Sequence, residues 1–358
     1  MITKRGRSAK LLATMGVVAA VGATLSVTAP AAQATIVLSG FGVVFQSSTG
    51  NVATLNPDGS ESDLSWTMDP TSSPSVTADI SGSSVVAFKT DNGLLGRMNL
   101  GSGVLQFDSA AVAPHTSPAI VVDSSHKIRT VFQNDGVVKQ RISNNDSTTL
   151  GGSVAPNTSP ATAWNLITGL NKTVYVDSSG YLSQFVNGAP SRIGVGLAVA
   201  SGTSPSVAAG TLDSEIAYNG AGGDLTIYKS SDASVNDTGE AITSGTNPSI
   251  AALATGGFVA AYVNNGTLHI LDASGFGHDT GLAMAPGSSP AIAADNSDSG
   301  YRVIFGDASR HVSTYFSNGV SQHSNSVMRA GTSPAITAST AEVVSCIPHP
   351  GCIIIRAR

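Results

Sequence analysis

A proline returns at a nearly constant spacing through most of this chain. Each of these prolines follows Ser or Asn, and an apolar residue stands six positions before it. The spacings between consecutive prolines are 44, 42, 45, 43, 42 and 44 residues. The prolines are Pro74, Pro118, Pro160, Pro205, Pro248, Pro290 and Pro334. A fixed period in this range is the mark of a repeat architecture, so we expect one structural unit repeated around seven times.

An aromatic residue keeps the same period in a second register. Its spacings are 43, 44, 43, 43, 44 and 43 residues. The positions are Phe45, Phe88, Phe132, Tyr175, Tyr218, Tyr262 and Phe305. A turn rich in Gly, Asn, Asp and Ser follows most of them, which is typical of a β-hairpin. Each unit therefore contains a strand after the proline, an aromatic strand, a tight turn and two further strands.

Four short strands in each unit predict an all-β fold, a seven-bladed β-propeller of four-stranded antiparallel blades. The residue after each proline is always Ser or Ala, as an innermost strand at a crowded central channel requires. The aromatic strands carry consecutive apolar residues, such as Val44 and Phe45. Strands that are buried on both faces have this pattern, so we expect the aromatics to form the core between blades.

The chain ends indicate how the ring closes. The first unit has an aromatic strand with no proline strand before it, and the last proline strand, within 335–340, has no aromatic strand after it. We expect these two strands to share one blade, so that the propeller spans residues 35–340. Residues 341–358 form two apolar runs around a Pro-rich loop and predict a hairpin. Two further blade strands are the alternative for this segment.

The first 34 residues have the pattern of a secretory signal peptide. Lys4, Arg5, Arg7 and Lys10 precede an apolar run, and Ala32-Gln33-Ala34 supplies a small-x-small cleavage site. We therefore expect a secreted protein, extracellular or associated with the cell wall, with no membrane span. Without this segment the chain keeps 14 basic and 23 acidic residues, a formal charge of −9. Such a balance argues against nucleic acid as a partner, since a phosphate backbone requires a clustered basic surface.

The sequence lacks the usual signatures of catalysis. It contains only four glutamates, which do not recur in register, so the paired carboxylates of a glycosidase do not stand out. It also has no nucleophile elbow, zinc-protease motif or phosphate-binding loop. We expect no cofactor. Two cysteines and His349 lie together near the C-terminus, but a closed zinc site would need one more ligand.

The repeat resembles tandem propeller repeats of secreted actinobacterial proteins and, more distantly, tachylectin-type and fungal seven-bladed propeller lectins. The resemblance is carried by the proline and aromatic registers over residues 36–340 and by segments such as 258–294. It implies carbohydrate binding in shallow grooves between adjacent blades, with an aromatic ring stacked on the sugar.

The chain departs from that pattern at the position where such repeats often carry a Trp. The equivalent residues here are Ala53, Gly96, Lys139, Ser183, Thr226, His269 and Ser313. The only tryptophans, Trp66 and Trp164, occupy different places in their units. Polar residues directly after the core aromatic are further candidates for ligand binding, although solvated strand ends have the same pattern. They are Gln46, Lys89, Gln133 and Asn219.

Three functions remain compatible with these observations. The first is a secreted, non-catalytic, lectin-like protein that binds a glycan or polysaccharide in interblade grooves, with weak single sites adding by multivalency. A structural or interaction module that holds another exported protein is the second. The third is an extracellular polysaccharide-active enzyme, which would need a non-repeating cluster of acidic or His residues at one rim.

The C-terminal cysteines generate a first testable prediction. Cys346 and Cys352 enclose a five-residue loop, and export would place them in an oxidising compartment. We expect them to form a disulfide in a mature chain that starts at Thr35. Intact-mass measurement of the denatured, unreduced exported protein should show that start and no thiol labelling. Two labelled cysteines would contradict the pairing.

Overall fold

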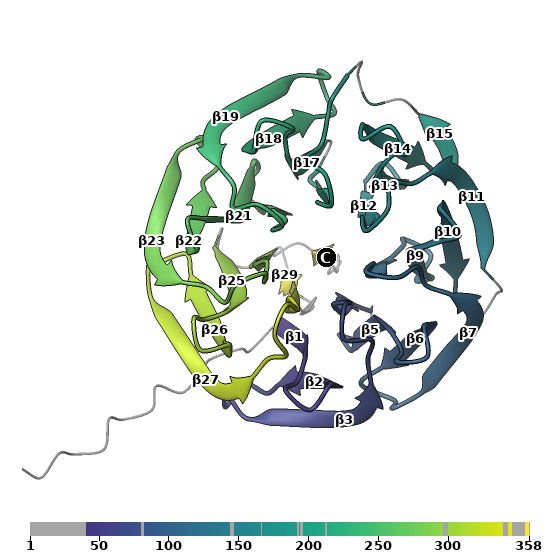
Figure 1. Cartoon of the computed structure of the whole chain (residues 1–358), viewed down its shortest axis with the longest axis vertical. Coiled ribbons are helices and arrows are strands. Elements are labelled where there is room, and N and C mark those ends of the chain that lie inside the picture. Colours follow the sequence, from purple (N-terminus) through teal and green to yellow (C-terminus); the bar gives the residue numbers. More distant parts are fainter. Residues whose placement is uncertain are drawn as a thin grey trace, which may run out of the picture. The chain divides into compact units, whose positions relative to one another are not determined.

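The computed structural model describes residues 41–79, 82–143, 147–165, 167–191, 193, 196–211, 213–295, 300–338, 343–345 and 355–357. In this part of the chain seven four-stranded antiparallel sheets follow one another around a centre, which confirms the seven-bladed β-propeller (Figure 1). The expected leader and both cysteines lie outside the described residues. Among the residues that are described, none belongs to a helix long and apolar enough to cross a bilayer.

The strands of each blade follow one another in the chain, except in blade 1. Blade 1 contains β28 (Ala335–Ala338), β1 (Phe41–Gln46), β2 (Asn51–Leu55) and β3 (Glu61–Thr67). Blade 2 contains β4 (Ser75–Ala78), β5 (Ser84–Lys89), β6 (Leu94–Asn99) and β7 (Leu105–Ala111). Blade 3 contains β8 (Ala119–Val122), β9 (Ile128–Asn134), β10 (Val137–Ile142) and β11 (Thr148–Ser153). Blade 4 contains β12 (Ala161–Asn165), β13 (Leu170–Val176), β14 (Leu182–Val186) and β15 (Ala189–Ser191).

The remaining three blades repeat the same order. Blade 5 contains β16 (Ser206–Ala209), β17 (Ser214–Asn219), β18 (Asp224–Lys229) and β19 (Val235–Ala241). Blade 6 contains β20 (Ser249–Ala252), β21 (Phe258–Asn264), β22 (Thr267–Leu271) and β23 (Gly277–Ala283). Blade 7 contains β24 (Ala291–Ala294), β25 (Tyr301–Gly306), β26 (His311–Phe316) and β27 (Ser321–Val327).

The ring closes as the chain ends predicted. Strand β28 pairs antiparallel with β1, with Ala335 opposite Val44 and Ile336 opposite Val43. The C-terminal part of the propeller therefore supplies one strand of the first blade. Beyond it, β29 (Val343–Ser345) pairs antiparallel with β30 (Ile355–Ala357) in a separate two-stranded sheet. These two short strands add nothing to a blade, in contrast to the alternative considered for this segment.

Tight turns between the second and third strands follow from local sequence. Asp135-Gly136 joins β9 to β10 with φ angles of 50° and 71°, and Asn265-Gly266 joins β21 to β22 with 49° and 78°. Two consecutive residues with positive φ are what a two-residue hairpin turn needs, and Asn-Gly and Asp-Gly tolerate this conformation best.

The hydrophobic core lies between blades. The seven aromatics of the second register are between 0% and 7% exposed, which confirms their predicted place in the core. Apolar side chains form seven clusters in the described part of the chain, and each cluster joins two neighbouring blades. Around Phe45, for example, Val43 of blade 1 packs with Ile304 and Val312 of blade 7. Each blade therefore buries its faces only against its neighbours.

The residue before each repeated proline links the blades in a closed circle of hydrogen bonds. The backbone N–H of each such residue donates to the side-chain oxygen of the equivalent residue in the next blade, at N–O distances of 2.7 to 2.9 Å. In order, the residues are Ser73, Ser117, Ser159, Ser204, Asn247, Ser289 and Ser333, and the last donates back to the first. The repeated Ser-Pro motif is therefore an interblade connector.

This circle yields a stability prediction at the point where the chain ends meet. Ser73→Ala removes the hydroxyl oxygen that accepts from the N–H of Ser333 at 2.9 Å. We expect the free energy of unfolding in urea to fall by about 1 kcal/mol, because a partly buried donor loses its partner.

Ser75→Ala is the matched control for this measurement. The Oγ of Ser75 is buried and has no hydrogen-bond partner among the described residues, so its removal should cost little or stabilise slightly. Equal losses for the two variants would show that the Ser73 hydroxyl contributes nothing specific.

Candidate functional site: the grooves between blades

Four side-chain positions recur at the interface of adjacent blades, and the groove between blades 6 and 7 shows them clearly. Leu282 comes from the outer strand of blade 6, and Phe305, Ser313 and His323 come from three successive strands of blade 7. Together they line a cavity with a volume of about 280 Å³. Asp307, Ser309 and Gln322 complete its polar wall. The carboxylate of Asp307 is engaged by the N–H groups of Ser309 and His311, at 2.8 and 2.9 Å.

The same positions in the groove between blades 1 and 2 carry an exposed aromatic pair. Trp66 on β3 and Phe107 on β7 have ring centroids 5.5 Å apart in an edge-to-face arrangement. They are 39% and 48% exposed, unlike the buried core ring of Phe88 beneath this groove. Gly96 makes room here, since a Cβ at this position would lie 2.7 Å from the Phe88 ring. The result is an apolar, solvent-facing platform that spans two blades.

Ionisable groups occupy these positions in the groove between blades 5 and 6. The hydroxyl of Tyr262 donates to Glu240 at 2.9 Å, and burial together with this carboxylate raises the Tyr262 pKa. His269 lies beside the Tyr262 ring, with its Nε2 3.5 Å from Asp279. These side chains satisfy one another, so the groove presents a paired polar network.

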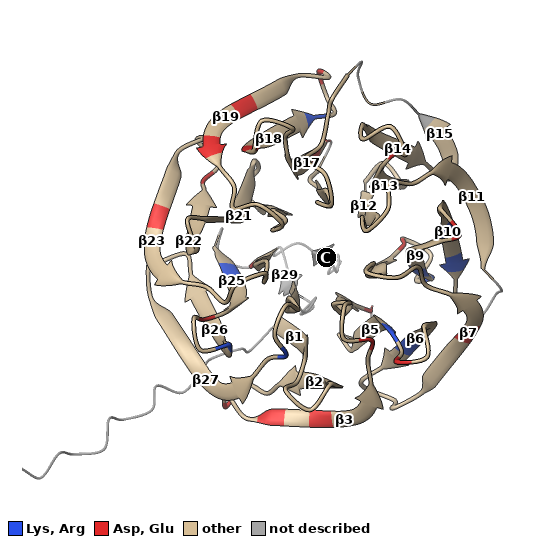
Figure 2. Ribbon diagram, viewed as in Figure 1, with Lys and Arg blue, Asp and Glu red and all other residues tan. Residues whose placement is uncertain are grey.

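The groove residues differ from one interface to the next. Between blades 2 and 3 the positions carry Ala110, Phe132, Lys139 and Thr149, and between blades 4 and 5 they carry Leu197, Tyr218, Thr226 and Asp237. Acidic residues lie on the outer strands β3, β19 and β23 (Figure 2). The ring thus repeats its core, whereas its groove surface does not repeat.

The four polar residues that follow the core aromatics are buried between blades. Gln46, Lys89, Gln133 and Asn219 are 0%, 4%, 4% and 2% exposed. The side-chain amide of Gln46 donates to the carbonyl oxygens of Gly50 and Met68 at 3.0 and 3.1 Å. Burial leaves these side chains no open surface for a ligand. We therefore assign them to holding the blades together.

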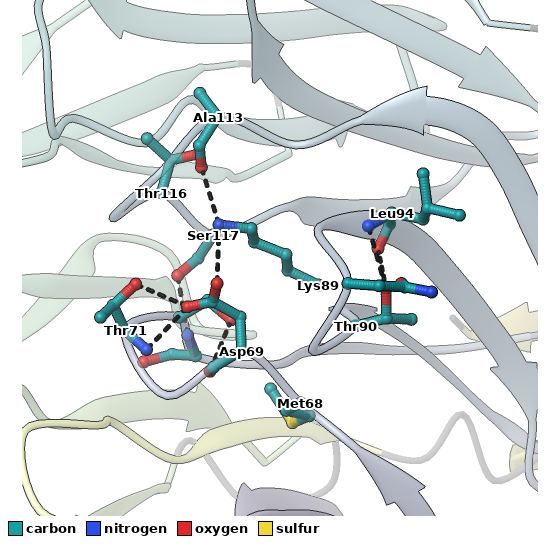
Figure 3. Close-up of polar contacts among 12 residues, drawn as sticks. Met68, Asp69, Thr71, Lys89, Thr90, Leu94, Ala113, Thr116 and Ser117 are labelled. Carbon is teal, nitrogen blue, oxygen red and sulfur yellow. Dashed lines mark hydrogen bonds and ion pairs between the residues drawn. The ribbon is translucent and has the colours of Figure 1, made fainter.

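Lys89 shows this structural role most fully. Its Nζ lies 3.0 Å from the Asp69 carboxylate and donates to the carbonyl oxygen of Ala113 at 3.3 Å (Figure 3). Asp69 precedes β4, and Ala113 precedes β8, so one side chain joins the connections that lead into two consecutive blades. Burial raises the pKa of Asp69, but hydrogen bonds from Thr71 and Lys89 outweigh it, and the net pKa is below 3.8.

Trp164 lies apart from Trp66. It is a half-buried residue of β12 in blade 4, and the guanidinium carbon of Arg129 lies 5.1 Å from its ring centroid. The indole Nε1 is buried without a hydrogen-bond partner in the part of the chain that is described. Of the residues proposed from sequence, only Trp66 has an exposed ring in a groove. Its partner Phe107 was missed, as it has no special place in the repeat.

No group of three or more His, Cys, Asp or Glu residues is arranged to hold a metal ion within the described ranges. This statement does not reach Cys346, Cys352 and His349, which lie outside them.

Comparisons with known proteins identify the fold. No protein family matches the sequence, and no curated protein does. Solved structures do match: a fucose-binding lectin of Aleuria aurantia, described as a six-bladed propeller, has 16% identity and a TM-score of 0.53, covering 72% of this chain and 95% of that one. The SapL1 lectin, in complex with α-methyl fucoside, has 14% identity and a TM-score of 0.51, with 71% and 95% covered.

An enzyme is also among the similar structures. Virginiamycin B lyase from Staphylococcus aureus has 12% identity and a TM-score of 0.51, covering 70% of this chain and 82% of that chain. The chain is therefore a β-propeller similar in fold to fungal lectins and to this lyase. At such identities the likeness shows the fold alone, and function must be argued from the grooves.

The role of Lys89 is testable by substitution. Lys89→Met keeps most of the apolar stem but leaves Asp69 and the Ala113 carbonyl without the ammonium. We expect the free energy of unfolding to fall by about 2 kcal/mol at neutral pH. Lys229→Met is the control, because Lys229 is 47% exposed and lies 3.6 Å from Glu215, and exposed pairs contribute about 0 to 1 kcal/mol.

Acid should narrow the difference between wild type and Lys89→Met. Because the folded state lowers the pKa of Asp69, its contribution is present above the unfolded-state pKa and is lost as pH falls through the folded value. Urea unfolding at neutral pH and below about pH 3 should show this convergence. A difference that stays constant with pH would mean that the ion pair is not its source.

Proposed function

We propose that this propeller is an exported, non-catalytic protein that binds carbohydrate in its interblade grooves. The observation that carries the proposal is the exposed Trp66 and Phe107 pair between blades 1 and 2. Aromatic faces bind the C–H face of a sugar through apolar contact, while the hydroxyl groups remain available for hydrogen bonds. The export signal of residues 1–34 supports an extracellular place for such binding.

The groove between blades 6 and 7 supports the same proposal with different chemistry. Its cavity combines the apolar side chains of Leu282 and Phe305 with polar groups from Ser313, Gln322 and His323. A mostly concave site with a few convergent polar groups is typical of small-ligand binding. Because the two grooves differ, each contributes a distinct weak site. Avidity would then come from a polymer that reaches both, and less from seven equal sites.

Fold neighbours add to this proposal. The names of two of them describe lectins, one with fucose recognition and one with bound α-methyl fucoside. A protein-interaction module is the alternative, since an exposed aromatic pair can also dock another protein.

The aromatic pair can be tested directly. Trp66→Ala and Phe107→Ala should each weaken retention on a polysaccharide by about tenfold, equivalent to about 1.4 kcal/mol, because each removes half of the stacking platform. The probes are immobilised neutral polysaccharides together with α-methyl fucoside in solution. Retention and the tryptophan emission of Trp66 are the two measurements.

Phe276→Ala is the control for this experiment. Phe276 is 70% exposed and lies between β22 and β23, outside the four groove positions. Its removal should leave retention unchanged. If no glycan retains the wild-type protein, the carbohydrate proposal fails and the interaction module replaces it. If all three variants lose retention equally, binding is a general effect of exposed rings.

A further inference from the structure

A second kind of cavity lies between blades 2 and 3. It has a volume of about 340 Å³ and is lined by residues of β5, β6 and β7 of blade 2, by Ile128 at the start of β9 and by Ser143 just after β10. Its polar lining includes Arg97, Asn99 and Gln106. This cavity shares no residue with the exposed aromatic pair.

Arg97 is buried in this cavity wall with part of its charge unmatched. The residue is 3% exposed. Its Nη2 donates to Gln106 at 2.9 Å and to the carbonyl oxygen of Ser143. Its Nε and Nη1 have no hydrogen-bond partner in the described residues. Burial, followed by the nearby Arg141, lowers the Arg97 pKa to about 10, which leaves the guanidinium charged at neutral pH.

The charges around Arg97 do not balance. Arg141 and Asp108 are 8% and 5% exposed, and they pair with each other at 3.4 Å between Nη1 and Oδ2. Two guanidinium groups therefore face one carboxylate. No lining residue of the cavity carries a carboxylate. A buried charge without a partner costs several kcal/mol in a protein interior, so one anionic group would complete this cluster.

The equivalent cavity between blades 4 and 5 shows what a balanced arrangement looks like. It has a volume of about 240 Å³, and its cation is Lys172. The Nζ of Lys172 donates to the hydroxyl groups of Ser214 and Ser230, and Asp213 supplies a carboxylate on the cavity wall. Charge excess is therefore specific to the Arg97 cavity and is not a general property of the repeat.

We propose that the cavity between blades 2 and 3 binds the carboxylate of a small organic acid of the size of an acidic monosaccharide, with Arg97 as the recognising group. Guanidinium groups bind carboxylates through two parallel hydrogen bonds, and Nε and Nη1 are the two atoms that such a fork uses. A single negative charge matches the single excess positive charge. This site is independent of the proposed groove function, because neither Trp66 nor Phe107 takes part.

Calorimetric titration with sodium glucuronate at constant ionic strength tests the proposal. Wild-type protein should bind glucuronate, and Arg97→Gln should weaken binding at least about tenfold. Arg97→Gln is expected to fold, since replacing an unmatched buried cation by a neutral group is often neutral or stabilising. Arg97→Lys, which keeps the charge without the fork, should retain partial binding.

Controls separate charge recognition from other effects. Arg310→Gln removes an exposed positive charge from the turn before β26 and should leave binding unchanged. Trp66→Ala should also leave it unchanged, which distinguishes this site from the carbohydrate grooves. Glucose and inorganic phosphate are the ligand controls. The proposal is overturned if glucuronate does not bind, if glucose or phosphate binds as well as glucuronate, or if Arg97→Gln binds like wild type.

Discussion

The circle of hydrogen bonds at the repeated Ser-Pro motif is the constraint on which the propeller depends. Every member is both donor, through its N–H, and acceptor, through its side chain, so each blade fixes the position of the next. Such a circuit is complete only when the last unit reaches the first, as Ser333 does at Ser73. In an open repeat array the end units remain exposed. Here the pairing of β28 with β1 and the clusters between blades cover both ends.

The sequence predicted the architecture because its repeated positions are those that geometry restricts most. Proline and its preceding Ser or Asn recur at the circle, and the aromatic recurs where both strand faces are buried. Packing between blades tolerates few alternatives at these points, so the period survives in the residues. Closure followed from the order of strands at the chain ends, which is a topological property and needs no side-chain detail.

The grooves were harder to predict, for two physical reasons. Burial of Lys89 and Gln46 comes from the connection that passes over them from a neighbouring blade, and a polar residue at a strand end has the same sequence pattern whether covered or exposed. The pairing of Trp66 with Phe107 joins residues on two outer strands. A register shift between β6 and β7 also interrupts the simple alternation by which a face could be assigned.

Variation among the grooves is itself informative about function. Core positions must stay nearly constant for the blades to stack, whereas groove positions on the same strands are free to change, and the seven interfaces have diverged into aromatic, ionic and small-residue types. A residue that lowers stability without a packing benefit stands out against this background. Arg97 is such a residue, because its buried atoms remain without partners while the equivalent Lys172 is fully engaged. Local violations of this kind concentrate at functional sites, where a ligand supplies what the fold does not.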